Sequence, residues 1–221
     1  MASKAYPGKC RICQEETTKR TYASHFKKVH FSKVGDEQYL ILVDTPSPSP
    51  FWLFLLANPN AQLTDLDIIL RDIWLECCNH LSAFTIGGCE YQSESFSEDI
   101  SSTKSMNVAL KKVIGPGSVF SHEYDFGSTT YLRLKVIDVV NTDDADGKVT
   151  FIGRNSMPEI KCHKCGEQAG QICQDCMEGD EWVFCSSCAE THTCDEEMLI
   201  RITNSPRSGE CGYDGGMYDN E

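Results

Sequence analysis

The sequence predicts an α+β protein, with a central antiparallel sheet and packed helices flanked by two small zinc-stabilised modules. Cys and His residues gather in two clusters, one near each end of the 221-residue chain, and their spacing is typical of metal ligands. Between the clusters, apolar residues follow helix-like and strand-like periods in turn. The expected segments are a C2H2-like zinc finger in residues 1–33, an α/β domain in 34–155, and a Cys-rich two-zinc module and tail in 156–221.

Charge is unevenly distributed along the chain. The net charge is -13 and the sequence pI is near 4.9, which argues against a protein that coats nucleic acid with its whole surface. Residues 1–33 hold eight Lys and Arg against two Glu, a net +6, so the rest of the chain stands at -19. This asymmetry predicts an anionic partner at the N-terminal end.

The Cys residues indicate metal binding rather than disulfides. There are 13 of them, many in C-x-x-C pairs, and no secretory signal precedes them. An apolar leader and an 18-residue apolar run are both missing from the sequence. We therefore expect a cytoplasmic protein that does not enter a membrane.

The N-terminal cluster is close to a C2H2 finger. Two thiolates on a tight knuckle and two imidazoles about one helical turn apart can surround Zn²⁺ as a tetrahedron. The spacer between the pairs is one residue shorter than usual, and an aromatic residue common after the second Cys is replaced near Thr17. Tyr22 stands where a finger places a core residue. The expected ligands are Cys10, Cys13, His25 and His30.

Basic residues around this finger are candidate contacts to phosphate groups. One finger reads only about 3 bp, too little for specificity alone. The expected partner is nucleic acid or a ribonucleoprotein such as the ribosome, and the alternative is a solvated basic face on a structural or protein-binding finger. The candidate contacts are Lys19, Arg20, Lys27 and Lys28.

The C-terminal cluster has enough ligands for two structural zinc ions, which makes about three per chain. A cross-brace is preferred, with Cys162, Cys165, Cys185 and Cys188 in one site and Cys173, Cys176, His192 and Cys194 in the other. A sequential pairing stays open, in which the first two C-x-x-C pairs share one site. Cys211 is an alternative ligand in place of His192 or Cys194. The pattern resembles B-box and MYND-type fingers, which commonly bind proteins.

The middle segment alternates strands and helices. Strands are expected at 39–43 and 51–57, followed by a helix from Thr64 to Asn79 with a capping box formed by Thr64 and Asp67. Cys77 is expected on the apolar face of this helix. Further elements are a strand at 84–86, a loop at 92–105, a short helix at 108–113, strands at 118–126 and 131–140, and a hairpin turn at 146–147 leading into 149–152. The strand at 131–140 is expected to be half-buried, because Leu132, Leu134 and Val136 alternate with Arg133, Lys135 and Ile137.

Part of this segment resembles the plasmid pRiA4b ORF-3-like family, also labelled insertion-element passenger, TnpR-like. The resemblance covers roughly residues 36–153 and is carried by Phe51–Phe54, Leu63–Trp74, His80–Gly88 and Phe120–Gly127. It implies an α/β fold with a curved antiparallel sheet and packed helices, and no established reaction. Cys-rich C-terminal extensions also occur in relatives. Where the family has an acidic residue, a small residue and Trp, this chain has residues 128–131, Ser-Thr-Thr-Tyr.

The preferred hypothesis is a non-enzymatic adaptor. Its finger contacts nucleic acid or a ribonucleoprotein, and its acidic body and Cys module contact protein. The TnpR label suggests a resolvase, but the clustered Arg and nucleophilic Ser of a serine recombinase are missing from the sequence. Two alternatives stay open: a purely protein-binding module, and an enzyme with its site at His80, His122 and Asp125. For Asp125, capping the turn at Gly127 is favoured over catalysis.

Overall fold

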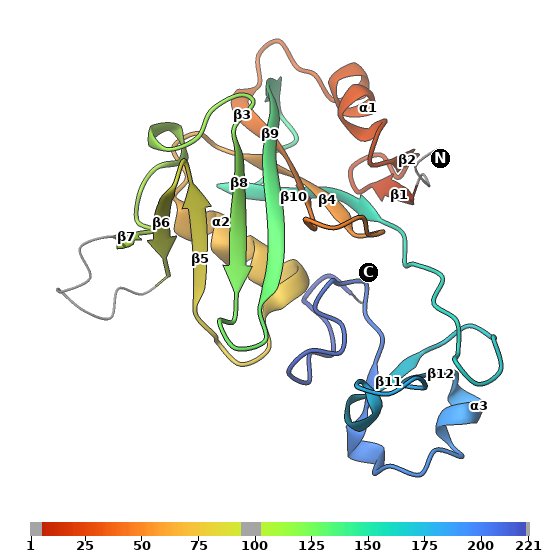
Figure 1. Ribbon diagram of the computed structural model, residues 1–221. Coiled ribbons are helices and arrows are strands. Elements are labelled where there is room, and N and C mark those ends of the chain that lie inside the picture. Colours follow the sequence, from red (N-terminus) through yellow and green to blue (C-terminus); the bar gives the residue numbers. More distant parts are fainter. Residues whose placement is uncertain (1–5, 94–102, 220–221) are drawn as a thin grey trace. The chain divides into compact units, whose positions relative to one another are not determined.

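The structure is a computed structural model that describes residues 6–93 and 103–219. The chain divides into two units (Figure 1). The first consists of Met1–Leu70 and His80–Ser156, and the second of Arg71–Asn79 and Met157–Glu221. The finger segment thus belongs to the same unit as most of the middle segment. Residues 71–79 group with the C-terminal segment.

Ten strands form one sheet in the first unit, in the order β2-β1-β10-β4-β3-β9-β8-β5-β6-β7. Every pairing is antiparallel except that of β6 with β7. The α+β class is therefore confirmed. The strands are β1 (Pro7–Cys10), β2 (Glu16–Thr18), β3 (Asp36–Asp44), β4 (Trp52–Ala57), β5 (Ser82–Ile86), β6 (Cys89–Gln92), β7 (Thr103–Ser105), β8 (Val119–Tyr124), β9 (Thr130–Thr142) and β10 (Val149–Asn155).

Periodicity explains the central strands. All six residues of β4 are buried, as expected for a strand covered on both faces. In β9, Leu132, Leu134 and Val136 are buried while Arg133 and Lys135 between them are exposed, so the predicted half-buried strand is confirmed.

The hairpin expected at 146–147 is wrong. β9 pairs with β3 and β8, whereas β10 pairs with β4 and β1. The connection between β9 and β10 therefore crosses two strands of the sheet. Local turn signals cannot distinguish a hairpin from such a crossover, because both need the same turn residues. In the loop expected at 92–105, residues 94–102 lie outside the described residues, and 103–105 form β7.

The helices are short. α1 (Tyr22–Val29) belongs to the finger, α2 (Leu63–Leu70) follows β4, and η2 (Leu110–Lys112) is a 3₁₀ turn. The chain continues from α2 into a π-helical turn, η1 (Arg71–Leu75), closed by Glu76 N donating to Arg71 O at 3.0 Å. The helix expected to reach residue 79 thus ends at Leu75, and Cys77 lies beyond it.

The capping box expected at Thr64 and Asp67 is also wrong. Asp65 Oδ2 accepts from the Gln62 backbone N at 2.8 Å and satisfies the helix start instead. Asp67 is buried and its Oδ1 lies 2.7 Å from His122 Nε2. A neighbouring acidic residue therefore takes the capping role, and tertiary packing recruits Asp67.

The second unit has a small three-stranded sheet in the order β12-β11-β13. Residues 71–79 pack with its tail. Trp74 Nε1 donates to Asn204 O at 2.9 Å, and Met217 N donates to Asp72 O at 2.8 Å. The elements are β11 (Gln171–Cys173), η3 (Gln174–Cys176), β12 (Val183–Phe184), α3 (Ser186–Ala189), η4 (Glu196–Met198) and β13 (Leu199–Arg201).

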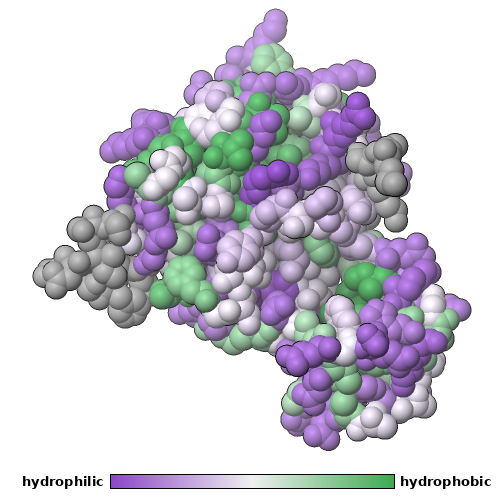
Figure 2. Space-filling view, viewed as in Figure 1, coloured by the Kyte–Doolittle hydropathy of each residue, from purple (hydrophilic) through white to green (hydrophobic). Residues whose placement is uncertain are grey.

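On the face seen in Figure 2, hydrophilic residues predominate and hydrophobic ones form small patches. None of the helices within residues 6–93 and 103–219 is long and apolar enough to cross a membrane.

Candidate metal centres

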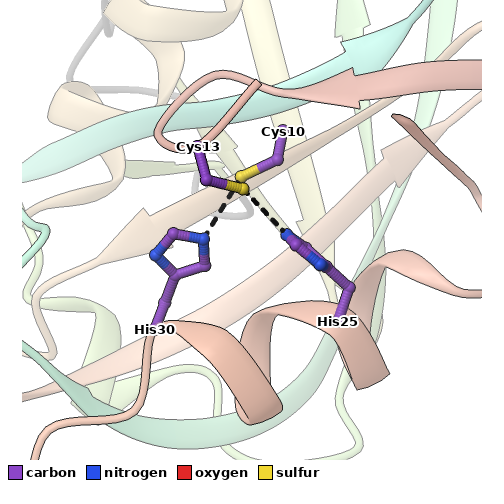
Figure 3. A group of neighbouring side chains, drawn as sticks. All are labelled: Cys10, Cys13, His25 and His30. Carbon is purple, nitrogen blue, oxygen red and sulfur yellow. Dashed lines mark hydrogen bonds between the residues drawn. The ribbon is translucent and has the colours of Figure 1, made fainter. Parts of the chain in front are cut away.

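The first candidate centre lies between the β1–β2 turn and α1. The structure brings the four expected residues together, with the two sulfurs facing the two imidazoles (Figure 3). Cys10 Sγ is 3.5 Å from His30 Nε2, and Cys13 Sγ is 3.4 Å from His25 Nε2. Gln14 shapes the knuckle, since its left-handed backbone (φ 62°) lets its N donate to Cys10 O at 2.9 Å.

These distances fit a tetrahedral zinc ion. Bond lengths of about 2.3 Å for Zn–S and about 2.0–2.1 Å for Zn–N place neighbouring sulfur and nitrogen about 3.6 Å apart, and two sulfurs about 3.8 Å apart. The sulfur–nitrogen distances of the finger fall close to this edge length. All four donor atoms lie within 4.8 Å of one another. The finger can therefore hold a metal ion without rearrangement.

Both imidazoles also face a carboxylate. His30 Nδ1 is 2.9 Å from Asp144 Oδ2, and His25 Nδ1 is 3.5 Å from Glu15 Oε2. Carboxylates in this position orient a metal-binding imidazole and fix its tautomer. Neither carboxylate was expected at the finger from the sequence. Glu15 follows Cys13 by two residues, so short spacing could have indicated it, whereas Asp144 lies 114 residues from His30.

The finger is built into the core of the first unit. β1 pairs with β10, and the buried Tyr22 ring stacks on Phe54 with centroids 4.3 Å apart. The Tyr22 hydroxyl donates to Ile152 O, and burial raises its pKa, so it stays a donor. Gly153 is required beside it, because a Cβ there would overlap the Tyr22 ring.

Two further centres lie in the second unit, with the cross-brace grouping. One group contains Cys162, Cys165, Cys185 and Cys188, and the other contains Cys173, Cys176, His192 and Cys194. Cys165 Sγ is 3.5 Å from Cys185 Sγ. Cys176 Sγ is 3.5 Å from His192 Nε2 and 3.6 Å from Cys194 Sγ. These distances match tetrahedral edges as the finger's do, and the sequential pairing does not describe this geometry.

The electrostatics of these thiols favour a bound cation. Burial raises the pKa of Cys162, but backbone amides of Cys185, Cys165 and Lys164 outweigh it and bring the pKa to about 6. Hydrogen bonding to Cys185 raises the pKa of Cys188 to about 12. The Cys162 thiol therefore ionises readily, whereas Cys188 beside it resists a second negative charge. A metal ion removes this conflict, because a coordinating thiol is deprotonated outright.

The four expected nucleic-acid contacts have different surroundings. Lys19 forms an ion pair with the buried Asp44. Lys27 Nζ donates to Asp138 Oδ2 at 2.9 Å, and this bond holds the pKa of Asp138 below its usual value. Arg20 and Lys28 are exposed. Two of the four cations thus neutralise carboxylates of their own unit.

Two of the three residues considered for catalysis, His122 and Asp125, are engaged in packing or in a turn. The third, His80, is partly exposed, and its Nε2 lies 3.7 Å from Asp125 Oδ2. His122 is fully buried and pairs with Asp67, the residue expected from the sequence to cap a helix. Asp125 has a left-handed backbone (φ 65°), and its Oδ1 accepts from Gly127 N at 3.0 Å. The expectation that Asp125 caps this turn is confirmed. A buried His122 offers no surface to a substrate.

No family model matches the chain, and no curated protein matches it. Among solved structures, the chain is similar to MM3350 from Methanosarcina mazei Go1, a protein of unknown function, with a TM-score of 0.46 and 16% sequence identity. The similarity covers 58% of this chain and 76% of that one.

Proposed function

We propose that the chain is a non-enzymatic zinc-binding adaptor, whose finger binds nucleic acid or a ribonucleoprotein and whose acidic body and Cys module bind protein. The carrying observation is that the centres at both ends have four protein donors each. Catalytic zinc sites keep a position open for water or substrate, whereas four-donor Cys and His sites are structural. The resemblance to the pRiA4b ORF-3-like family is part of the proposal and implies no reaction.

Zinc is the metal that this donor chemistry favours. Thiolate and imidazole donors at tetrahedral edge distances suit Zn²⁺ better than the oxygen-seeking cations Mg²⁺ and Ca²⁺. One ion in the finger and two in the cross-brace give three per chain. These ions would hold short knuckles in place, since the smaller unit has few apolar residues around its Cys side chains.

The exposed side of the finger supports an anionic partner. Arg20 and Lys28 are exposed, and the chain after α1 exposes Phe31 at 56% and Val34 at 90%. Cations bind phosphates, and an exposed aromatic ring can stack on a base. This mixture suits single-stranded nucleic acid or a ribonucleoprotein surface better than a purely polar face would.

Filter binding tests the nucleic-acid half of the proposal. The zinc-loaded full chain is titrated with single-stranded RNA and with duplex DNA at several salt concentrations. Lys28→Glu should weaken binding and lower the slope of log affinity against log salt by about 0.7–0.9, the value of one phosphate contact. Lys112→Glu on η2 is the matched control, exposed and outside the finger, and should leave the slope unchanged.

Absence of binding at low salt would refute this half. The exposed Val29, Phe31 and Val34 would then favour the purely protein-binding alternative, because apolar residues grouped at a surface mark protein contacts. Equal losses in Lys28→Glu and Lys112→Glu would show a general charge effect and would contradict a finger-specific contact.

A further inference from the structure

Three cysteines of the second unit meet although 133 residues separate Cys78 from Cys211 in the chain. Cys77 and Cys78 follow η1, and Cys211 lies in the C-terminal tail. Their sulfurs lie within 4.8 Å of one another, with Cys78 Sγ and Cys211 Sγ 4.0 Å apart. Neither Cys211 nor the Cys77–Cys78 pair belongs to the cross-brace groups. The sequence had allowed Cys211 to replace His192 or Cys194 as a ligand, and the structure does not place it in that group.

We propose that these three thiols form a fourth metal centre, which takes a thiophilic divalent ion such as Zn²⁺ and fastens the C-terminal tail to residues 71–79. His80 follows Cys78 by two residues, so an imidazole adjacent in the sequence is available as a fourth donor. Cys₃His is a common structural zinc set. Twelve of the 13 cysteines then have a metal-binding role, and Cys89 is the one outside the four groups.

The backbone at Cys211 is the first independent support. Cys211 and Gly212 have φ of 50° and 68°, and Tyr213 N donates to Glu210 O at 2.8 Å across them. Two central residues with positive φ are typical of a type I′ turn, where Gly, Asn and Asp are preferred and Cys is not. A costly conformation at a Cys indicates a role for its side chain, since such strain concentrates at functional sites.

The same backbone feature occurs in the metal knuckles. A residue with positive φ directly follows Cys13 and Cys165, namely Gln14 (φ 62°) and Gly166 (φ 77°). Asn79 (φ 57°) follows Cys78 in the same way, and Gly212 follows Cys211. The turns that present sulfur in the fourth group thus resemble those that present it in two of the other three.

A buried cation next to the thiols is the second support. Arg207 is fully buried, and its guanidinium donates from an NH2 group to Cys77 Sγ at 3.4 Å. Hydrogen bonds to a ligand sulfur stabilise its thiolate form. Three thiolates around a divalent ion carry a net charge of -1, which complements the guanidinium.

The proposed fourth metal centre would hold a C-terminal tail that already packs against residues 71–79. Ser205 Oγ donates to Trp74 O at 2.6 Å, and Tyr213 OH donates to Ile73 O at 3.5 Å. Cys211 lies between these two anchors in the chain. A metal ion there would join the ends of a long loop, where a cross-link restricts the unfolded chain most.

Metal counting tests the proposal. Full-length protein is purified with a reductant, and zinc per chain is measured by elemental analysis. We expect four zinc in the natural protein, three in Cys211→Ser, and four in the control Cys89→Ser. Cys211→His should restore four, because it returns a donor at the same place. His80→Ala should release one ion at a lower chelator concentration than the natural protein does.

A second readout reports on the tail itself. Trypsin should cleave after the buried Arg207 at least tenfold faster in Cys211→Ser than in Cys89→Ser, because the released tail becomes accessible. Three zinc in the natural protein and in Cys211→Ser would overturn the fourth centre, as would a Cys78–Cys211 disulfide in the reduced preparation. Cys13→Ser separates the two proposals: its loss of one ion tests the finger alone.

Discussion

Replacing Tyr22 tests whether the finger is part of the first unit's core or a module attached to it. The ring is fully buried, stacks on Phe54 at 4.3 Å and lies 6.0 Å from Trp52. A detachable finger would use such a residue only to support its own helix. Here Tyr22 also contacts β4 and β10, so its removal should loosen the large sheet.

The expected magnitude follows from what the side chain contacts. Truncating a large buried aromatic residue to Ala costs about 3–5 kcal/mol, which lowers the melting temperature of a domain of this size by about 6–20 °C. Tyr22→Phe removes only the hydroxyl. The Ile152 carbonyl still accepts from Arg11 N at 2.8 Å, so this change should cost about 1 kcal/mol rather than the full penalty of an unsatisfied group.

Thermal unfolding by circular dichroism, with zinc present, measures the loss. Hydrogen exchange of β4 and β10 amides shows whether it reaches the sheet. Tyr131→Ala is the control, since Tyr131 is an exposed tyrosine of β9 and should change stability by no more than about 0.5 kcal/mol. If Tyr22→Ala released zinc from the finger while β4 and β10 kept full protection, the finger would be autonomous and the reasoning would be refuted.

Two further predictions concern the buried pair and the small unit. Asp67→Leu should destabilise the first unit by about 1–3 kcal/mol, because the buried His122 loses its hydrogen-bond partner. Asp67→Asn keeps an acceptor and should lose less stability. Urea unfolding compares the two variants, and equal losses of stability would contradict a hydrogen-bonding role. A strong chelator should unfold the second unit first, since Cys side chains make up much of one cluster of buried residues in this unit. The rate of amide hydrogen exchange should then rise in β11 before it rises in β9. Simultaneous loss of protection in both strands would contradict the idea that the two units depend on metal separately.

Local sequence was sufficient wherever the physical cause was local. Alternation along β9 predicted its buried face, because a strand turns successive side chains to opposite sides. Cys10 and Cys13 predicted a knuckle, because two residues between them allow both sulfurs to face one point. The helix start was placed within one residue, although the capping side chain was Asp65 rather than Thr64.

The failures had long-range causes. Asp67 looked like a cap at three residues' spacing, but its partner is His122, 55 residues away. The turn at 146–147 was read as a hairpin, although the next strand pairs with β4 and β1. In both cases the local pattern is compatible with two structures, and tertiary packing determines which one forms.

The sequence by itself determined the fold class, six of the ten strands of the central sheet (β3, β4, β5, β8, β9 and β10) and the residues available to bind metal, because these depend on composition, period and short spacing. Only the tertiary structure decided which cysteines share a centre, that β1 extends the sheet beside β10, and that Cys77, Cys78 and Cys211 meet. Short spacing limits what neighbouring residues can do. It carries no information about contacts between segments 133 residues apart, which depend on how buried surfaces pack.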